Sequence, residues 1–150
     1  MKTAASDPVV TVDGDWSRVG SNRARWRANG VLHVVLGDER HVQGDLYEER
    51  DGRDALALVG VLIGERASVT NLTDIRRIRR TTAAVRRLPS HPSTKRLALL
   101  VGGPISRMLG NAYMGIVKLP HATRLFTDEE KAVAWLLSGG APESDSGSRL

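Results

Sequence analysis

The residues best suited to bind a charged group lie in one segment, TDIRRIRRTTAAVRRL (residues 73–88). It contains six arginines: Arg76, Arg77, Arg79, Arg80, Arg86 and Arg87. The planar guanidinium group pairs well with carboxylates and phosphates. Residues 73–96 carry eight basic side chains and one acid, Asp74, although the whole chain has a net charge of only +5. The positive charge is therefore concentrated in one part of the chain.

The same segment has the periodicity of an amphipathic helix. On a helical wheel the arginines fall on one side, and the opposite side holds Ile75, Ile78, Thr81, Thr82, Val85 and Leu88. We therefore predict a helix over residues 75–88 with a basic outer face; a shorter helix capped by Thr81 is the alternative. Solvent, a protein or phosphorylated partner, and a nucleic acid all fit such a face. Nucleic acid is not favoured, because residues 73–96 contain no aromatic side chain for stacking.

A second candidate site is the sequence VGGPISR, in which Gly102 and Gly103 lie between an expected strand and an expected helix. Backbone amides at the start of a helix can bind an anion, and Arg107 lies one turn further on. The spacings of the dinucleotide-binding and P-loop motifs are absent, so a simple chain turn is the alternative. We expect a small ligand or anion here if the site is used.

Catalytic and metal-binding patterns are not found. The four histidines lack a partner at metal-ligand spacing, no serine has an evident histidine and acid partner, and the chain has no cysteine. We therefore predict a protein that is not an enzyme and uses no cofactor or metal. The longest apolar run, residues 55–64, is too short to cross a membrane, and no signal peptide is evident. A cytoplasmic protein without a membrane partner is expected.

The elements that would position these residues can be read from the patterns along the chain. Residues 1–20 are polar and predict a flexible N-terminal arm, in which PVVTV could add an edge strand, and residues 139–150 predict a disordered tail. Alternation in RARWRANGVLHVVL predicts a hairpin with a two-residue turn at Asn29 and Gly30, both at positive φ. A row of arginines lies on one face of its first strand, where solvent is the expected neighbour.

Helices and strands then alternate. We predict helices over residues 53–64, 104–115 and from Thr127, and strands over residues 66–72, 96–102 and 122–126. Gly64 is the expected helix end, and Thr127 with Glu130 is the expected capping pair. With the segment 75–88 this order predicts an α/β sandwich with about four helices. Its mixed sheet should be mostly parallel and begin with an antiparallel hairpin.

Residues 97–136, LALLVGGPISRMLGNAYMGIVKLPHATRLFTDEEKAVAWL, resemble a largely uncharacterised group of small bacterial proteins with a STAS-like fold. STAS is the module of sulfate transporters and anti-sigma-factor antagonists. The resemblance rests on the pattern SR.LGN, here Ser106 to Asn111, and on LF.DEE.A..WL, here Leu125 to Leu136. It extends more weakly over residues 21–138 and implies one STAS-like domain there.

The resemblance also implies a regulatory role. In regulatory STAS domains a phosphorylatable Ser or Thr lies at a helix start after a strand, and Thr81 and Thr82 fall near that position in VTNLTDIRRIRRTTAAV. The usual Asp-Ser-Ser-Gly pattern is missing, and Arg79 and Arg80 stand in its place. We expect a regulatory or protein-interaction domain that binds a protein partner through the arginines of residues 75–88. Homodimerisation is also compatible with the sequence.

Overall fold

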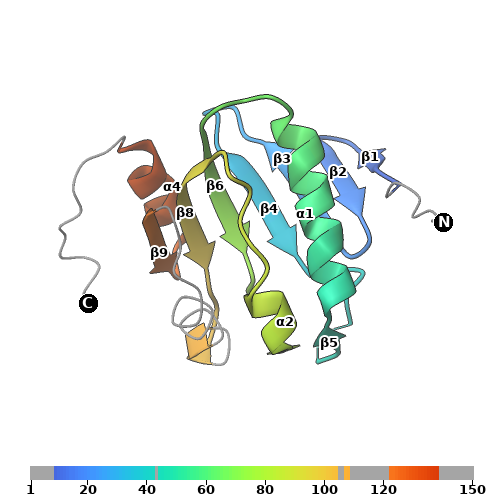
Figure 1. Ribbon diagram of the computed structural model, residues 1–150. Coiled ribbons are helices and arrows are strands. Elements are labelled where there is room, and N and C mark those ends of the chain that lie inside the picture. Colours follow the sequence, from blue (N-terminus) through green and yellow to red (C-terminus); the bar gives the residue numbers. More distant parts are fainter. Residues whose placement is uncertain (1–8, 43, 105–106, 109–121, 139–150) are drawn as a thin grey trace.

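The computed structural model describes residues 9–42, 44–104, 107–108 and 122–138. A seven-stranded sheet runs through the molecule in the order β1-β2-β3-β4-β6-β8-β9 (Figure 1). Its strands are β1 (Thr11–Asp13), β2 (Trp16–Val19), β3 (Asn22–Trp26), β4 (Leu32–Leu36), β6 (Val69–Asp74), β8 (Thr94–Leu100) and β9 (Ala122–Phe126). The described helices are α1 (Glu49–Ile63), α2 (Ala83–Arg86) and α4 (Glu129–Leu137). Short strands β5 (Leu46–Tyr47) and β7 (Arg80–Thr81) form a separate parallel pair.

The predicted α/β class with a mixed sheet is confirmed. Strands β1 to β4 are antiparallel, and β4, β6, β8 and β9 are parallel. The prediction of a mostly parallel sheet is wrong, because only half of the strand pairs described in this sheet are parallel. The edge strand that PVVTV could add is present in part as β1, which covers residues 11–13 at the edge of the sheet. The rest of the predicted flexible arm is wrong for residues 16–19, which form β2. Three helices are described rather than about four. Most of the predicted helix 104–115, residues 1–8 and the predicted tail 139–150 lie outside the described residues.

The predicted hairpin forms, but with a longer turn. The amide of Gly30 donates to the carbonyl of Arg27 at 2.9 Å, and the amide of Arg27 donates to Val31 at 2.9 Å, so three residues make the loop. Gly30 has a φ of 88°, whereas no described non-glycine residue has a positive φ. Asn29 therefore does not adopt the left-handed conformation that a two-residue turn would require. Its side chain instead accepts a hydrogen bond from the amide of Val31.

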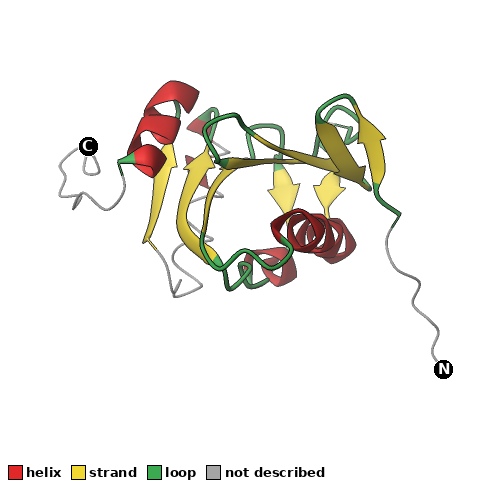
Figure 2. Ribbon diagram, turned by 90° about the horizontal axis from the view of Figure 1, so that it is seen from above, coloured by secondary structure: helices red, strands yellow, loops and turns green. Residues whose placement is uncertain are grey.

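The two long helices cover opposite faces of the sheet (Figure 2). Helix α1 packs on β2, β3 and β4, and ends at Gly64 as predicted. Helix α4 packs on β6, β8 and β9. Asp128 caps α4 by accepting hydrogen bonds from the amides of Glu130 and Lys131, so the predicted cap at Thr127 is wrong by one residue. We call the two sides of the sheet the α1 face and the α4 face.

Each face has its own apolar core. On the α1 face, strand residues such as Ala24 and Val34 pack with Leu58 and Ile63 of α1. On the α4 face, the packed residues include Leu72, Ala98 and Leu100 of the strands and Ala132, Trp135 and Leu136 of α4. Burial of aliphatic surface on two faces stabilises the central strands from both sides. This explains the nearly continuous apolar sequence of β8.

The predicted amphipathic helix over residues 75–88 is wrong. The strand β6 extends to Asp74, and a turn, β7 and the four residues of α2 follow. The Asp74 carboxylate accepts hydrogen bonds from the amide of Arg76 at 2.9 Å and from its guanidinium group at 3.1 and 2.8 Å. Such local capture of backbone amides competes with helix formation. Thr82, rather than Thr81, caps the short helix α2.

The loop after β4 is held by a buried carboxylate. Asp38 is 1% exposed and pairs with Arg18 at 2.7 Å and with Arg40 at 2.9 Å, and Arg18 also pairs with Glu39 at 2.8 Å. We call Arg18, Asp38, Glu39 and Arg40 the Asp38 network. Burial alone raises the pKa of a carboxyl group. Here the hydrogen bonds from Arg40 and the charges of Arg40 and Arg18 outweigh burial and hold the pKa of Asp38 below its usual value.

The substitution Asp38→Asn should lower the free energy of unfolding by about 3 to 5 kcal/mol, because it leaves two arginines without their buried partner. The carboxylate stabilises the fold fully above a pH of about 4, and this contribution is lost as the pH falls further, since the pKa of Asp38 is lowered by folding. Urea denaturation at several pH values measures both effects. A wild-type loss of stability between about pH 4 and pH 2 that Asp38→Asn fully retains would contradict the assignment.

The substitution Gly37→Ala should be more destabilising than Gly14→Ala. Both glycines have a φ of 64°, so each variant carries the cost of a left-handed residue, about 1 kcal/mol. A Cβ on Gly37 would lie 3.3 Å from side-chain atoms of His41 and Ile78, whereas a Cβ on Gly14 would meet nothing within 4 Å. We expect crowding to add about 1 kcal/mol or more at Gly37. Equal losses in thermal or urea denaturation would contradict this.

Candidate functional site

The six arginines of residues 76–87 do not form one surface. Arg76 pairs with Asp74 at 2.8 Å and lies 3.8 Å from Glu129. Arg77 donates to the carbonyl oxygens of Asp38 at 3.2 Å and His41 at 2.8 Å. Both side chains therefore hold loops at the carboxyl ends of the parallel strands. They are placed to stabilise the fold more than to receive a partner.

The remaining four arginines carry uncompensated charge. Arg79, Arg80 and Arg87 are exposed, and Arg86 is half-buried. Arg80 donates to the carbonyl of Gly44 at 3.3 Å. Among the described residues, none of the four forms an ion pair. They lie on β7 and α2 and the residues beside them, so this part of the surface is the basic patch that the sequence indicates.

The two candidate phosphorylation sites have hydroxyl groups that already make hydrogen bonds. Thr81 Oγ1 donates to the carbonyl of Tyr47 at 3.1 Å, and Thr82 Oγ1 accepts from the amide of Val85 at 3.3 Å. Both residues are half-buried. A phosphate on Thr82 would replace the cap of α2, and one on Thr81 would break its contact with β5. Phosphorylation of either residue stays a prediction.

The candidate anion site lies at the carboxyl end of β8, beside Arg76. A Cβ on Gly102 would lie 3.5 Å from Cγ of Arg76, so the backbone here runs close to that side chain. The amide of Arg107 donates to the carbonyl of Gly103 at 3.0 Å and is therefore used within the chain. Gly102, Gly103 and Arg107 are all exposed. The structure places these three residues near one another and near Arg76, and binding of an anion there stays a prediction.

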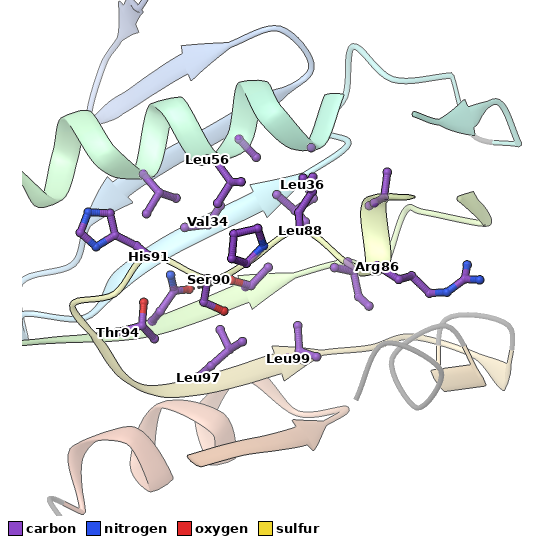
Figure 3. A pocket seen from close by; sticks show the side chains of 18 of the residues that line it. Val34, Leu36, Leu56, Arg86, Leu88, Ser90, His91, Thr94, Leu97 and Leu99 are labelled. Atoms are coloured by element: carbon purple, nitrogen blue, oxygen red, sulfur yellow. Dashed lines mark hydrogen bonds between the residues drawn. The ribbon is translucent and has the colours of Figure 1, made fainter. Parts of the chain in front are cut away.

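An apolar cavity on the α1 face was not predicted from the sequence. It has a volume of about 160 Å³ and lies between α1, the strands β4, β6 and β8, and the segment 81–94 (Figure 3). Its floor is formed by Leu97 and Leu99 of β8, which are 6% and 5% exposed. Neither residue belongs to the two packed cores. The apolar lining also includes Val34, Leu36, Leu56, Val59, Ile75, Ile78, Val85 and Leu88.

The cavity exists because the connection from β6 to β8 contains no long helix. Helix α2 has four residues, and the following residues 89–92 contain two prolines, which cannot donate the backbone hydrogen bonds of a helix. The segment therefore runs past β8 without filling the space above Leu97 and Leu99. The sequence could have indicated the cavity through PSHPSTK at residues 89–95, because its two prolines prevent one long helix from forming the whole connection.

Few polar groups line the cavity: Asn71 and Thr73 of β6 lie in its floor beside Leu97 and Leu99, and the others lie at its borders. Thr73 Oγ1 donates to Asn71 Oδ1 at 2.6 Å, and the amide of Ser93 donates to His91 Nδ1 at 3.0 Å. The Tyr47 hydroxyl donates to Asn22 Oδ1 at 2.5 Å, and burial raises the pKa of Tyr47 well above its usual value. Figure 3 shows the Arg86 side chain extending away from the labelled apolar side chains. The interior is therefore suited to a small apolar molecule rather than to an ion.

The described part of the chain contains neither a cluster of metal-binding side chains nor a helix that could span a membrane. No group of three or more histidine, aspartate or glutamate residues there could hold a metal ion. No described helix is long and apolar enough to span a membrane.

Comparison with solved structures gives a match to an uncharacterized protein. The chain is similar to the crystal structure of an uncharacterized protein from the DUF3478 family with a SpoIIAA-like fold, which is a STAS-like fold, from Shewanella loihica PV-4. The two share 12% sequence identity, and the match covers 91% of this chain and 98% of that chain with a TM-score of 0.48.

Comparison of the sequence with known proteins points to one family. No curated protein matches the chain. Residues 26–138, which are more than half of the chain, match the family described as Domain of unknown function (DUF7793). This range includes α1, the connection from β6 to β8 and all the residues that line the cavity. The chain therefore belongs to the DUF7793 family.

Proposed function

We propose that this protein is a binding domain without catalytic activity that holds a small apolar molecule in the cavity above β8. The observation that carries the proposal is the floor of the cavity: Leu97 and Leu99 are buried, but they face open space of about 160 Å³ instead of a packed core. An engineered protein cavity of about 150 Å³ lined by similar side chains binds benzene. A small aromatic or branched aliphatic molecule matches this volume and lining.

Burial of apolar surface would supply the affinity. Each CH₂ group moved from water into the cavity contributes about 0.8 kcal/mol. A ligand of six or seven carbon atoms therefore gains about 5 to 6 kcal/mol, which corresponds to a dissociation constant of about 0.1 mM at best, and the loss of its free motion weakens this into the millimolar range. The polar groups of Asn71 and Thr73 in the floor and of His91 at the border can select among ligands with one polar atom. The proposed role is recognition of such a molecule, with a regulatory output through neighbouring surfaces.

Filling the cavity should remove binding. Leu56 lines the cavity from α1, whereas Val61 lies on the same helix and is 58% exposed. We expect toluene to bind the wild-type protein saturably, as measured by chemical-shift changes of cavity-lining amides in NMR titrations. Leu56→Phe should weaken this binding by about tenfold or more, because the larger ring occupies the space. Val61→Phe should leave it unchanged.

Two results would contradict the proposal. One is the absence of saturable shifts with toluene and with an aliphatic probe such as cyclohexane. The other is an equal loss of binding in Leu56→Phe and Val61→Phe, since that would place the probe outside the cavity. Thermal denaturation of both variants shows whether each one is folded under the conditions of the titration.

A protein partner bound through the basic patch is the second candidate function. It is supported by the exposed guanidinium groups of Arg79, Arg80 and Arg87, which have no acidic partner among the described residues. Free guanidinium groups on a surface favour acidic or phosphorylated partners. Arg79 and Arg80 lie beside and on β7, which pairs with β5, and Tyr47 of β5 and Thr81 of β7 line the cavity. A partner here would contact the wall of the cavity.

Reversal of two charges tests this second candidate. Arg79→Glu with Arg80→Glu should leave the fold intact and abolish capture of the partner in affinity purification from the native host. Arg50→Glu with Arg53→Glu changes two exposed arginines of α1 by the same charge and should retain capture. If both double variants capture the same proteins as the wild type, the basic patch is not the binding surface.

A further inference from the structure

Among the described helices, α4 is the one on the α4 face of the sheet, and it covers β6, β8 and β9. No described helix lies over β2 and β3 on this face (Figure 2). Arg23 and Arg25 of β3 alternate with Ala24, which belongs to the core on the α1 face, so both arginines lie on the α4 face. They belong to the row of arginines that the sequence predicts to lie in solvent. These arginines are half-buried rather than free in solvent. The face is therefore an organised polar surface.

Three side chains form a row across this face. Arg25 and His33 are directly opposite each other on β3 and β4. Trp16 of β2 is one residue beyond the pair Ser17–Ala24, which places it beside Arg25. The guanidinium carbon of Arg25 lies 4.7 Å from the centroid of the Trp16 ring, and the rings of Trp16 and His33 meet edge to face at 5.4 Å. We call these residues the Trp16 row.

Arg25 differs from its neighbours in having no acidic partner. Arg18 pairs with Asp38 and Glu39, Arg23 with Glu39 at 3.0 Å, and Arg27 with Glu129 at 2.8 Å. No ion pair or hydrogen bond within the described residues involves the side chain of Arg25, and its buried Nε has no acceptor. A positive charge held in place without a counter-charge attracts an anion.

His33 supplies a second donor without a partner. It is 5% exposed, and its Nδ1 lies 3.4 Å from a guanidinium nitrogen of Arg27. Because arginine can only donate, Nδ1 accepts, and the proton of the neutral ring is on Nε2. Nε2 is buried and has no hydrogen-bond partner. Burial lowers the pKa of His33 to about 4, so the ring is neutral at physiological pH.

We propose that the Trp16 row binds a small organic phosphate whose ring stacks on Trp16 and whose phosphate group accepts hydrogen bonds from Arg25 and His33. Opposite residues of an antiparallel pair have Cβ atoms about 5 Å apart, so one phosphate can reach both donors. The indole of Trp16 is half-buried, and Arg23 and Arg25 lie over its ring at 4.4 and 4.7 Å, so a planar ring would meet the part of the indole that the two arginines leave open. This site is on the opposite face of the sheet from the apolar cavity and does not depend on its function.

Titration with phenyl phosphate and with inorganic phosphate at low ionic strength tests the proposal. Both should shift the indole N–H resonance of Trp16 and bind saturably, with phenyl phosphate tighter. Arg25→Gln should weaken the binding of phenyl phosphate by about tenfold or more, as expected for the loss of a charge-assisted hydrogen bond. Arg23→Gln is the matched control, because Arg23 also lies over Trp16, at 4.4 Å, but is neutralised by Glu39. It should change affinity by less than about threefold.

Two further variants separate the two contacts. Trp16→Ala should reduce the affinity for phenyl phosphate to that for inorganic phosphate, and Arg25→Lys, which keeps the charge, should retain part of the binding. If Arg25→Gln and Arg23→Gln lose affinity equally, the anion binds a diffuse positive surface and the proposal is wrong. Binding that does not saturate, or that is unchanged in Arg25→Gln, would overturn it as well.

Discussion

The connection from β6 to β8 is the constraint on which the rest of the molecule depends. It starts at Ile75, reaches β8 at Thr94, and contains only four residues of α-helix. A chain of this kind can reach the next parallel strand but cannot cover the α1 face of β8 as a long helix would. The open space above Leu97 and Leu99, the separate directions of the six arginines and the small β5–β7 sheet all follow from this connection.

Sequence patterns predicted the inward-facing residues of this connection better than its conformation. Ile75, Ile78, Val85 and Leu88 define the apolar side of the predicted helix, and all four do line the cavity. The periodicity was therefore informative about burial, while the Asp74 side chain and the pairing of β7 with β5 decided the backbone. Contacts between residues far apart in the chain, such as Arg80 with Leu46, cannot be read from local periodicity. The strand 122–126, the end of α1 at Gly64 and the β3–β4 hairpin depend on local signals, and these were predicted correctly.

The two faces of the sheet are stabilised by different interactions. The α1 face combines an aliphatic core with an apolar cavity, where burial dominates. The uncovered part of the α4 face is built from arginines, acids and one indole, where charge compensation dominates. Arginine alternating with alanine and tryptophan on β3 creates this division within five residues. The sequence showed the alternation, but only the pairing of strands revealed that Arg25 is left without an acid.

Asn22 lies between these two chemistries. Its side-chain oxygen accepts from Tyr47, which borders the cavity, and its backbone oxygen accepts from Arg40 of the Asp38 network at 3.2 Å. Its amide nitrogen donates to the carbonyl of Asp51 at the start of α1. The wall of the cavity at Tyr47 and the buried ion pairs thus contact the same residue, one through its side chain and the other through its backbone. Asn22 therefore completes a continuous chain of hydrogen bonds that joins the wall of the cavity to the Asp38 network on the other side of the sheet.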